Sequence, residues 1–193
     1  MKVILLFLFV FSFSLLGTEP KVVSFDKLHH RGKLTYIPNQ DTPFTGRAVR
    51  FYPSGHTVWE ENYKEGKYHG LRTEWYDNGQ MRGEVSWKDG KQDGLLTEWY
   101  ENGQKKEEIN YKDDKKNGLH TRWRENGQKW EEGTYKDGER DGPWTVWYEN
   151  GQKVVEGSYK DGKMDGLWAF WYRSGQKGRE QNYKDGKLMS AVA

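Results

Sequence analysis

Adjacent glutamates are the side chains in this sequence best suited to acid–base chemistry, because a glycoside hydrolase needs two carboxyl groups facing one sugar. Such pairs occur at Glu107-Glu108 and Glu131-Glu132. Glutamate also recurs among lysine and arginine at even-numbered positions, namely Glu74, Glu98, Glu108, Glu132, Glu156 and Glu180. Cross-strand ion pairs account for this recurrence without catalysis. We therefore predict no catalytic residues and no enzymatic activity.

Histidines and turn aspartates are the next candidates, as metal ligands. The histidines lack the spacing of a zinc site, so we expect all five to be exposed to solvent: His29, His30, His56, His69 and His120. Aspartate recurs in Lys-Asp-Gly turns, where each turn offers one carboxylate and a calcium loop would offer several: Asp89, Asp137, Asp161 and Asp185. Gly-x-Gly does not occur, so no dinucleotide fingerprint is present. The sequence predicts no metal site and no cofactor.

The charge and composition of the chain limit the classes of partner that it can bind. The formal net charge is +2, and basic and acidic residues alternate along the chain, so no basic stripe is available for phosphates and no nucleic acid is expected as a partner. Hydrophobic residues make up only 34% of the chain, while aromatic residues reach 16%, so aromatic packing must supply much of the core. Cysteine is absent, which excludes disulfides and leaves the redox compartment undetermined.

The first residues have the layout of a secretory signal. Lys2 is followed by a 14-residue apolar or small-residue run from Val3 to Leu16 and then by Gly17 and Thr18. This run is shorter than the ~20 residues that cross a bilayer as a helix. We expect residues 1–17 to be a signal peptide and the mature chain to be exported, periplasmic or extracellular. An uncleaved N-terminal anchor is the alternative.

A period of 24 residues organises the rest of the chain. Two series of six glycines each recur at this spacing: Gly55, Gly79, Gly103, Gly127, Gly151 and Gly175, and Gly46, Gly70, Gly94, Gly118, Gly142 and Gly166. Such a period is typical of arrays whose single units cannot bury their own apolar face. We expect six repeats over residues 46–187, an N-terminal cap with a degenerate repeat over 18–45, and a C-terminal tail over 188–193.

Each repeat contains two short alternating runs, such as LRTEWY (71–76) and RGEVSWK (82–88), joined by Asn78-Gly79. This pattern predicts a β-hairpin, and the array predicts an all-β fold, an elongated antiparallel meander of about twelve strands. Because the period is even, we expect all odd residues on one constant apolar face, including Thr73, Trp75 and Val85. If the odd residues of both strands of a hairpin lie on this face, the loop between the strands must contain an odd number of residues. This favours a three-residue loop with a glycine in the left-handed conformation.

On the expected even face, the early repeats are polar and the late repeats are aromatic and apolar. Aromatic side chains are enriched at protein interfaces. The sequence therefore nominates a partner-binding surface made of Trp130, Trp144, Val146, Tyr148, Trp168, Phe170 and Tyr172. The alternative is that these residues pack on each other or on the C-terminal tail.

The segments EEGTYKDGERDG (131–142) and EGSYKDGKMDG (156–166) resemble MORN repeats. With WYENGQK between such blocks, residues 28–187 resemble the bacterial MORN-variant repeats of YwqK-family antitoxins. Three positions depart from the pattern, namely Trp144, Asp114, and Arg124 where other repeats have tyrosine. The resemblance implies an antiparallel β array used for binding, and an antitoxin role belongs to this resemblance.

Three functions remain open at this stage. The favoured one is an exported, non-catalytic scaffold that binds another protein, such as an antitoxin or immunity protein. The second is a cell-wall or carbohydrate-binding array, which would favour the same aromatic residue in every repeat. The third is membrane-surface binding, against which the balanced charge argues, and we do not expect membrane binding after signal cleavage.

Overall fold

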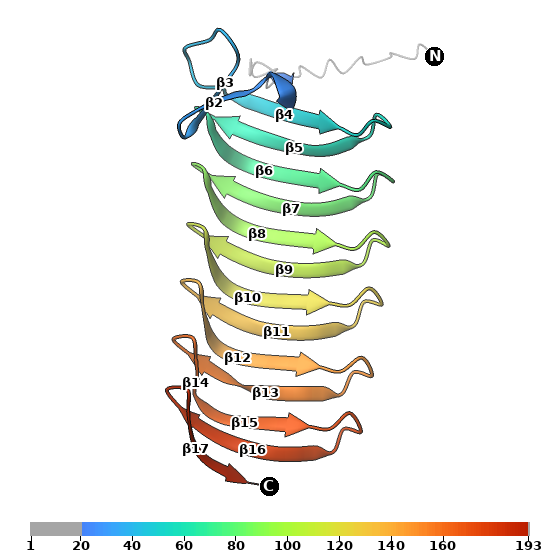
Figure 1. The fold of residues 1–193 in the computed structure, drawn as a ribbon, viewed down its shortest axis with the longest axis vertical. Coiled ribbons are helices and arrows are strands. Elements are labelled where there is room, and N and C mark those ends of the chain that lie inside the picture. Colours follow the sequence, from blue (N-terminus) through green and yellow to red (C-terminus); the bar gives the residue numbers. More distant parts are fainter. Residues whose placement is uncertain (1–20, 193) are drawn as a thin grey trace, which may run out of the picture.

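The computed structural model describes residues 21–192, which form one long 15-stranded sheet and a separate two-stranded sheet near the N-terminal end; within the repeats, consecutive strands of the long sheet lie side by side (Figure 1). All neighbours from β4 onward pair antiparallel, so the predicted all-β meander is confirmed. Most strands form the repeats: β4 (Gly46–Phe51), β5 (Thr57–Lys64), β6 (Lys67–Trp75), β7 (Met81–Lys88), β8 (Lys91–Trp99), β9 (Lys105–Lys112), β10 (Lys115–Trp123), β11 (Lys129–Lys136), β12 (Glu139–Trp147), β13 (Lys153–Lys160), β14 (Lys163–Met164), β15 (Gly166–Trp171), β16 (Lys177–Lys184) and β17 (Lys187–Val192).

The N-terminal segment covers one end of this sheet. It contains β1 (Val22–Ser24), the 3-10 helix η1 (Phe25–Lys27), β2 (His29–Arg31) and β3 (Leu34–Tyr36). Strand β1 pairs parallel with β4, and Phe25 packs edge-on against Trp59 at 4.5 Å between ring centroids. The buried cluster beneath this segment consists of Phe44, Ala48, Trp59 and Tyr63. The first edge of the sheet is therefore closed by strand pairing and by an aromatic core.

The other end of the sheet differs from the sequence prediction. Residues 188–192, expected as a tail, belong to β17, which pairs antiparallel with β16. The reason is local: the Lys184–Lys187 connection repeats the two-residue turns between earlier repeats, with Asp185 and Gly186 both at positive φ. The predicted signal peptide, residues 1–17, lies outside the described residues. No helix within residues 21–192 is long and apolar enough to cross a membrane.

Each hairpin closes through the predicted three-residue loop. In the second repeat, the Tyr76 amide donates to the Gln80 carbonyl at 2.8 Å and the Gly79 amide donates to the Tyr76 carbonyl at 2.9 Å. Gly79 has a φ of 83°, in the left-handed region that favours glycine. The loop is therefore Asp77-Asn78-Gly79. The glycine series from Gly55 to Gly175 marks the corresponding loop of each repeat.

The predicted division of faces into odd and even residues is wrong. A β-bulge follows each loop, so that Glu74 faces Gly83 while Trp75 faces Met81. Side chains alternate between the two faces along a strand, so the extra residue moves the even residues of the second strand onto the face of the odd residues of the first. Thr73 therefore shares its face with Glu84, and Arg72 shares the other face with Val85.

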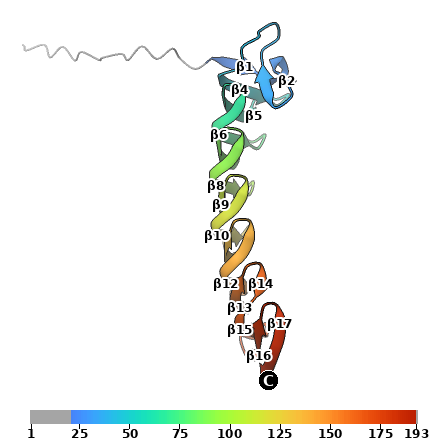
Figure 2. The same cartoon turned by 90° about the vertical axis from the view of Figure 1, so that its left-hand side faces the viewer.

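Two chemically distinct faces result. The threonine–glutamate face carries a cross-strand row of alternating residues: Glu60, Thr73, Glu84, Thr97, Glu108, Thr121, Glu132, Thr145 and Glu156. The opposite side, which we call the tyrosine face, carries most of the aromatic core. The strands bend near the inter-repeat turns, at bulges that contain glycines of positive φ such as Gly70 (Figures 1 and 2).

Candidate functional site

The tyrosine face consists of three rows that run across the strands. The tyrosine row near the inter-repeat turns contains Tyr63, Trp87, Tyr111, Tyr135, Tyr159 and Tyr183. The central row contains Val85, Leu96, Ile109, His120, Gly133, Trp144, Gly157 and Trp168. The charged row near the hairpin loops contains Glu74, Gly83, Glu98, Glu107, Arg122 and Glu131, and it becomes apolar at Val146, Val155 and Phe170.

Trp144 and Trp168 belong to the core of this face. Their exposed fractions are 2% and 3%. Each indole lies over a glycine of the neighbouring strand, so closely that a Cβ on Gly133 would come within 2.0 Å of Trp144 and one on Gly157 within 2.2 Å of Trp168. Residues with less than a few per cent exposure cannot anchor a partner. The prediction that these two tryptophans form part of a contact surface is therefore wrong.

Edge-to-face aromatic packing holds the late repeats together. Tyr135, Trp144, Tyr159 and Trp168 follow one another with ring centroids 5.6, 5.6 and 4.9 Å apart and interplanar angles of 77°, 85° and 81°. The Arg140 guanidinium lies 4.1 Å from the centre of the Trp144 ring. These contacts explain why aromatic residues accumulate in the late repeats: they fill the space above glycines.

The other five nominated residues do not form one patch. Val146 and Phe170 both face Val155 on the charged row. Trp130 is half-buried, with Arg122 over its ring. Tyr148 and Tyr172 begin hairpin loops, and Tyr172 is 61% exposed. The structure therefore places one pair on the tyrosine face and three residues along the side of the hairpin loops.

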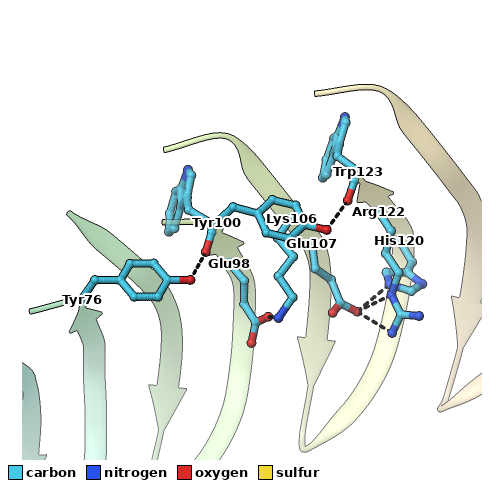
Figure 3. Close-up of polar contacts among 9 residues, drawn as sticks. Tyr76, Glu98, Tyr100, Lys106, Glu107, His120, Arg122 and Trp123 are labelled. Carbon is cyan, nitrogen blue, oxygen red and sulfur yellow. Dashed lines mark hydrogen bonds and ion pairs between the residues drawn. The ribbon is translucent and has the colours of Figure 1, made fainter. Parts of the chain in front are cut away.

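A spine of hydrogen bonds connects the hairpin loops. Tyr52, Tyr76, Tyr100 and Tyr148 each donate their hydroxyl to the carbonyl of a tryptophan in the next repeat, at 3.0, 2.8, 2.8 and 3.1 Å. Figure 3 shows the bonds of Tyr76 and Tyr100. Arg124, which departs from the tyrosine pattern, donates its guanidinium to Trp147 at 3.0 Å in the same place. The fourth repeat therefore keeps this bond with a different donor. The Tyr172 hydroxyl has no such bond within residues 21–192.

A buried charged cluster occupies the middle of the tyrosine face. His120 Nε2 lies 2.7 Å from Oε1 of Glu107, and Arg122 contacts the same carboxylate at 3.2 Å (Figure 3). Arg122 also contacts Glu131, at 3.4 Å. The bond with His120 and the Arg122 charge outweigh desolvation and lower the pKa of Glu107 to about 2. The cluster therefore holds a carboxylate ionised beneath the surface.

His120 corrects the expectation that the histidines are exposed, because only 1% of it is accessible. Its side chain belongs to the central row, where the positions 24 residues before and after it are Leu96 and Trp144. Aligning the repeats at this position would have found the burial. The described residues contain no group of three or more histidines, aspartates or glutamates that could hold a metal ion.

Exposed apolar side chains reach their maximum in the last repeat. The two most exposed large apolar residues within residues 21–192 are Met189 at 64% and Tyr172 at 61%. Leu167 and Leu188 lie close to them in the sequence and are 57% and 52% exposed. The sequence predicted Tyr172 as a partner-binding residue and missed the other three. Leu188 and Met189 were missed because residues 188–193 were assigned to a tail, and Leu167 because odd residues were placed on the constant apolar face.

Four of the repeats are similar to a known repeat family. The model of the MORN repeat variant family matches the chain four times, at residues 68–89, 92–113, 116–137 and 140–161. Each match begins at the second residue of β6, β8, β10 or β12 and ends in the next inter-repeat turn. No curated protein matches the chain significantly.

Proposed function

We propose that this MORN-repeat protein is a non-catalytic scaffold that binds another protein through its last repeat. One observation carries the proposal: Leu167, Tyr172, Leu188 and Met189 leave more than half of their surface in water. Exposed aromatic residues and methionine are enriched in protein interfaces. In the five earlier repeats the residue equivalent to Tyr172 bonds to the next repeat, whereas the Tyr172 hydroxyl makes no such bond within residues 21–192.

A capture experiment with matched variants tests this proposal. The mature chain, residues 18–193, is immobilised and exposed to envelope extract, and captured proteins are identified by mass spectrometry. Tyr172→Ser with Met189→Ser is expected to remove stoichiometric capture of one protein. Leu71→Ser with Met81→Ser, which changes residues 39% and 37% exposed in an early repeat, is the control and is expected to retain it. Equal capture by both folded variants would contradict a site in the last repeat.

Export is the second part of the proposal. It is supported by the short apolar run from Val3 to Leu16 behind Lys2. N-terminal sequencing of the protein recovered from the envelope or the medium is expected to begin near Thr18 or Glu19. A chain that begins at Met1 and remains with the membrane fraction would establish the anchor instead.

A toxin protein is the first partner class to examine, because the repeats resemble YwqK-family antitoxins. Candidate toxins are purified from the same envelope extract and tested for binding to the immobilised chain. Neutralisation of toxicity by the wild type, and its loss in the Tyr172→Ser and Met189→Ser variant, is the expected result. Capture of a partner without any toxic activity would retain the scaffold and remove the antitoxin role.

Glycan binding is a second candidate, favoured by one regular feature. Trp75, Trp99, Trp123, Trp147 and Trp171 recur once per repeat, and two strand spacings place successive positions ~10 Å apart. Lysine ammonium groups already lie over two of the rings, Lys105 at 5.7 Å from Trp123 and Lys153 at 5.6 Å from Trp171. Retention on purified wall glycan, reduced by Trp99→Leu and unaffected by Tyr172→Ser, would favour this function.

A further inference from the structure

One position of the charged row lacks a side chain. The residues at 24-residue intervals from Gly83 are Trp59, Glu107, Glu131, Val155 and Arg179, so the second repeat alone carries glycine there. The missing side chain leaves a hollow of about 170 Å³ on the tyrosine face. We call this hollow the Gly83 recess.

The walls of the Gly83 recess combine carboxylates with apolar surface. Gly83 lies directly opposite Glu74 on β6 and opposite Glu98 on β8, so the two carboxylates flank it on either side. Val85, Leu96 and Trp87 also line the hollow. Arg72, which pairs with Glu74, lines the hollow as well, so a ligand in the recess would meet two carboxylates, one guanidinium, and aliphatic or aromatic surface beside them.

The same row shows in another repeat what fits between two glutamates. Arg122 faces Glu107 on β9 and Glu131 on β11, and its guanidinium contacts both carboxylates, at 3.2 and 3.4 Å. The second repeat has the same order with the centre empty: glutamate, glycine, glutamate. The chain therefore contains, three strands away, an occupied version of its own recess.

Existing ion pairs do not use up the capacity of the two flanking carboxylates. Glu74 pairs with Arg72, and Glu98 pairs with Lys106 at 2.8 Å (Figure 3). Glu107 shows that a carboxylate in this row accepts two cationic or polar donors at once, since it contacts both His120 and Arg122. A carboxylate has about four lone-pair sites, so a second donor can be accommodated at Glu74 and at Glu98.

We propose that the Gly83 recess receives an arginine side chain of a partner protein. The guanidinium lies between Glu74 and Glu98, and the methylene stem runs along Val85 and Leu96. Arginine fits better than lysine, because its planar guanidinium can contact two carboxylates at once and is more weakly hydrated than an ammonium group. This inference rests on the proposed function as a protein-binding scaffold and adds a contact on early repeats, separate from the last repeat.

The recess can also be filled from within the chain. A Cβ added to Gly83 would meet its nearest atoms, the Thr97 carbonyl oxygen and Glu98 Cγ, at 3.7 and 3.9 Å, which are ordinary contacts. The variant Gly83→Arg should therefore place its own guanidinium between Glu74 and Glu98, as Arg122 lies between its glutamates. Gly83→Met supplies a side chain of similar length without charge.

The test is a titration of the mature chain with a short probe, acetyl-Gly-Arg-Gly-amide, followed by amide and indole chemical shifts in NMR spectra. The control probe replaces arginine by citrulline, which has the same shape and no charge. We expect saturable shifts at Gly83, Trp87 and Leu96 with the arginine probe, at least tenfold weaker binding of the citrulline probe, and at least tenfold weaker binding in Glu98→Gln. Glu108→Gln, on the opposite face, should bind as the wild type does.

The variants at Gly83 decide the result. Gly83→Arg should abolish the shifts and raise the melting temperature above that of Gly83→Met, because only arginine adds the two ion pairs. Shifts that are absent in the wild type, equal for both probes, or retained in Gly83→Arg would overturn the proposal. Since the titration needs no partner, its failure leaves the capture experiment on the last repeat untouched, and failure of that capture leaves this titration valid.

Discussion

His120 Nε2 lies 2.7 Å from Glu107 Oε1, in a chain whose sequence gives neither residue an obvious partner. The pair connects the central row to the charged row of the tyrosine face, and Arg122 joins it to Glu131. Because His120 is 1% exposed, the pair is a structural element that joins the third repeat to the fourth.

Acid should weaken the folded state through Glu107. Its pKa is about 2 in the fold against an ordinary value of 4.5, so the stabilisation is complete above pH 4.5 and is lost as the pH falls toward 2. We expect the free energy of unfolding of the wild type to exceed that of Glu107→Gln at pH 7. This difference should shrink by about 2 kcal/mol at the acid end, less than the full shift implies because water screens part of the charge. Urea titrations across this range measure it, and a difference independent of pH would contradict the assignment.

Glycines beneath tryptophans should not tolerate even a methyl group. Gly133→Ala would force Trp144 to move, since the new Cβ lies 2.0 Å from the indole, and we expect a loss on the order of 2 kcal/mol from overpacking. Gly83→Ala is the matched control, because its Cβ meets nothing closer than 3.7 Å. Thermal unfolding of both variants checks the difference. Equal melting temperatures would show that Trp144 does not pack on Gly133 as described.

Arg124 should be replaceable by the residue that the other repeats carry. Arg124→Tyr is expected to keep the bond to the Trp147 carbonyl and to change stability by less than about 0.5 kcal/mol, whereas Arg124→Leu should cost about 1 kcal/mol. Tyr172→Leu, whose hydroxyl has no equivalent bond within residues 21–192, is the control and should be nearly neutral. If Arg124→Tyr and Arg124→Leu lose the same stability, the spine of hydrogen bonds is not what this position contributes.

Substitutions of Trp168 and Tyr172 should differ in their effect on stability, because the first residue is part of the core and the second lies on the surface. Trp168→Ala removes a side chain that is 3% exposed and is expected to cost roughly 3–5 kcal/mol, while Tyr172→Ser changes a surface residue and should cost about 0.5 kcal/mol or less. Urea unfolding measures both values. A Trp168→Ala variant as stable as the wild type would restore this residue as a surface anchor.

The repeat period was enough to predict the hairpins, because glycines such as Gly79 mark loops that need a left-handed residue. The period did not predict which residues share a face, because a bulge follows each loop and leaves no signal in the spacing of the sequence. In the second repeat this bulge lies between Met81 and Gly83. Trp144 was predicted to lie on a binding surface because it is one of the late aromatic residues of the expected even face, whereas the structure packs it on Gly133. The Gly83 recess could be recognised only once Glu74 and Glu98 were known to face it across two strands.

Hydrogen–deuterium exchange of the scaffold with its captured partner bound is the most direct test of the central claim, that the last repeat binds a protein. We expect the largest new protection in β15 to β17 and in the hairpin loop that begins at Tyr172, with the middle repeats from β9 to β13 exchanging as they do in the unbound chain. Equal protection in every repeat would contradict the claim and favour a ligand that follows the whole array, as a glycan polymer would.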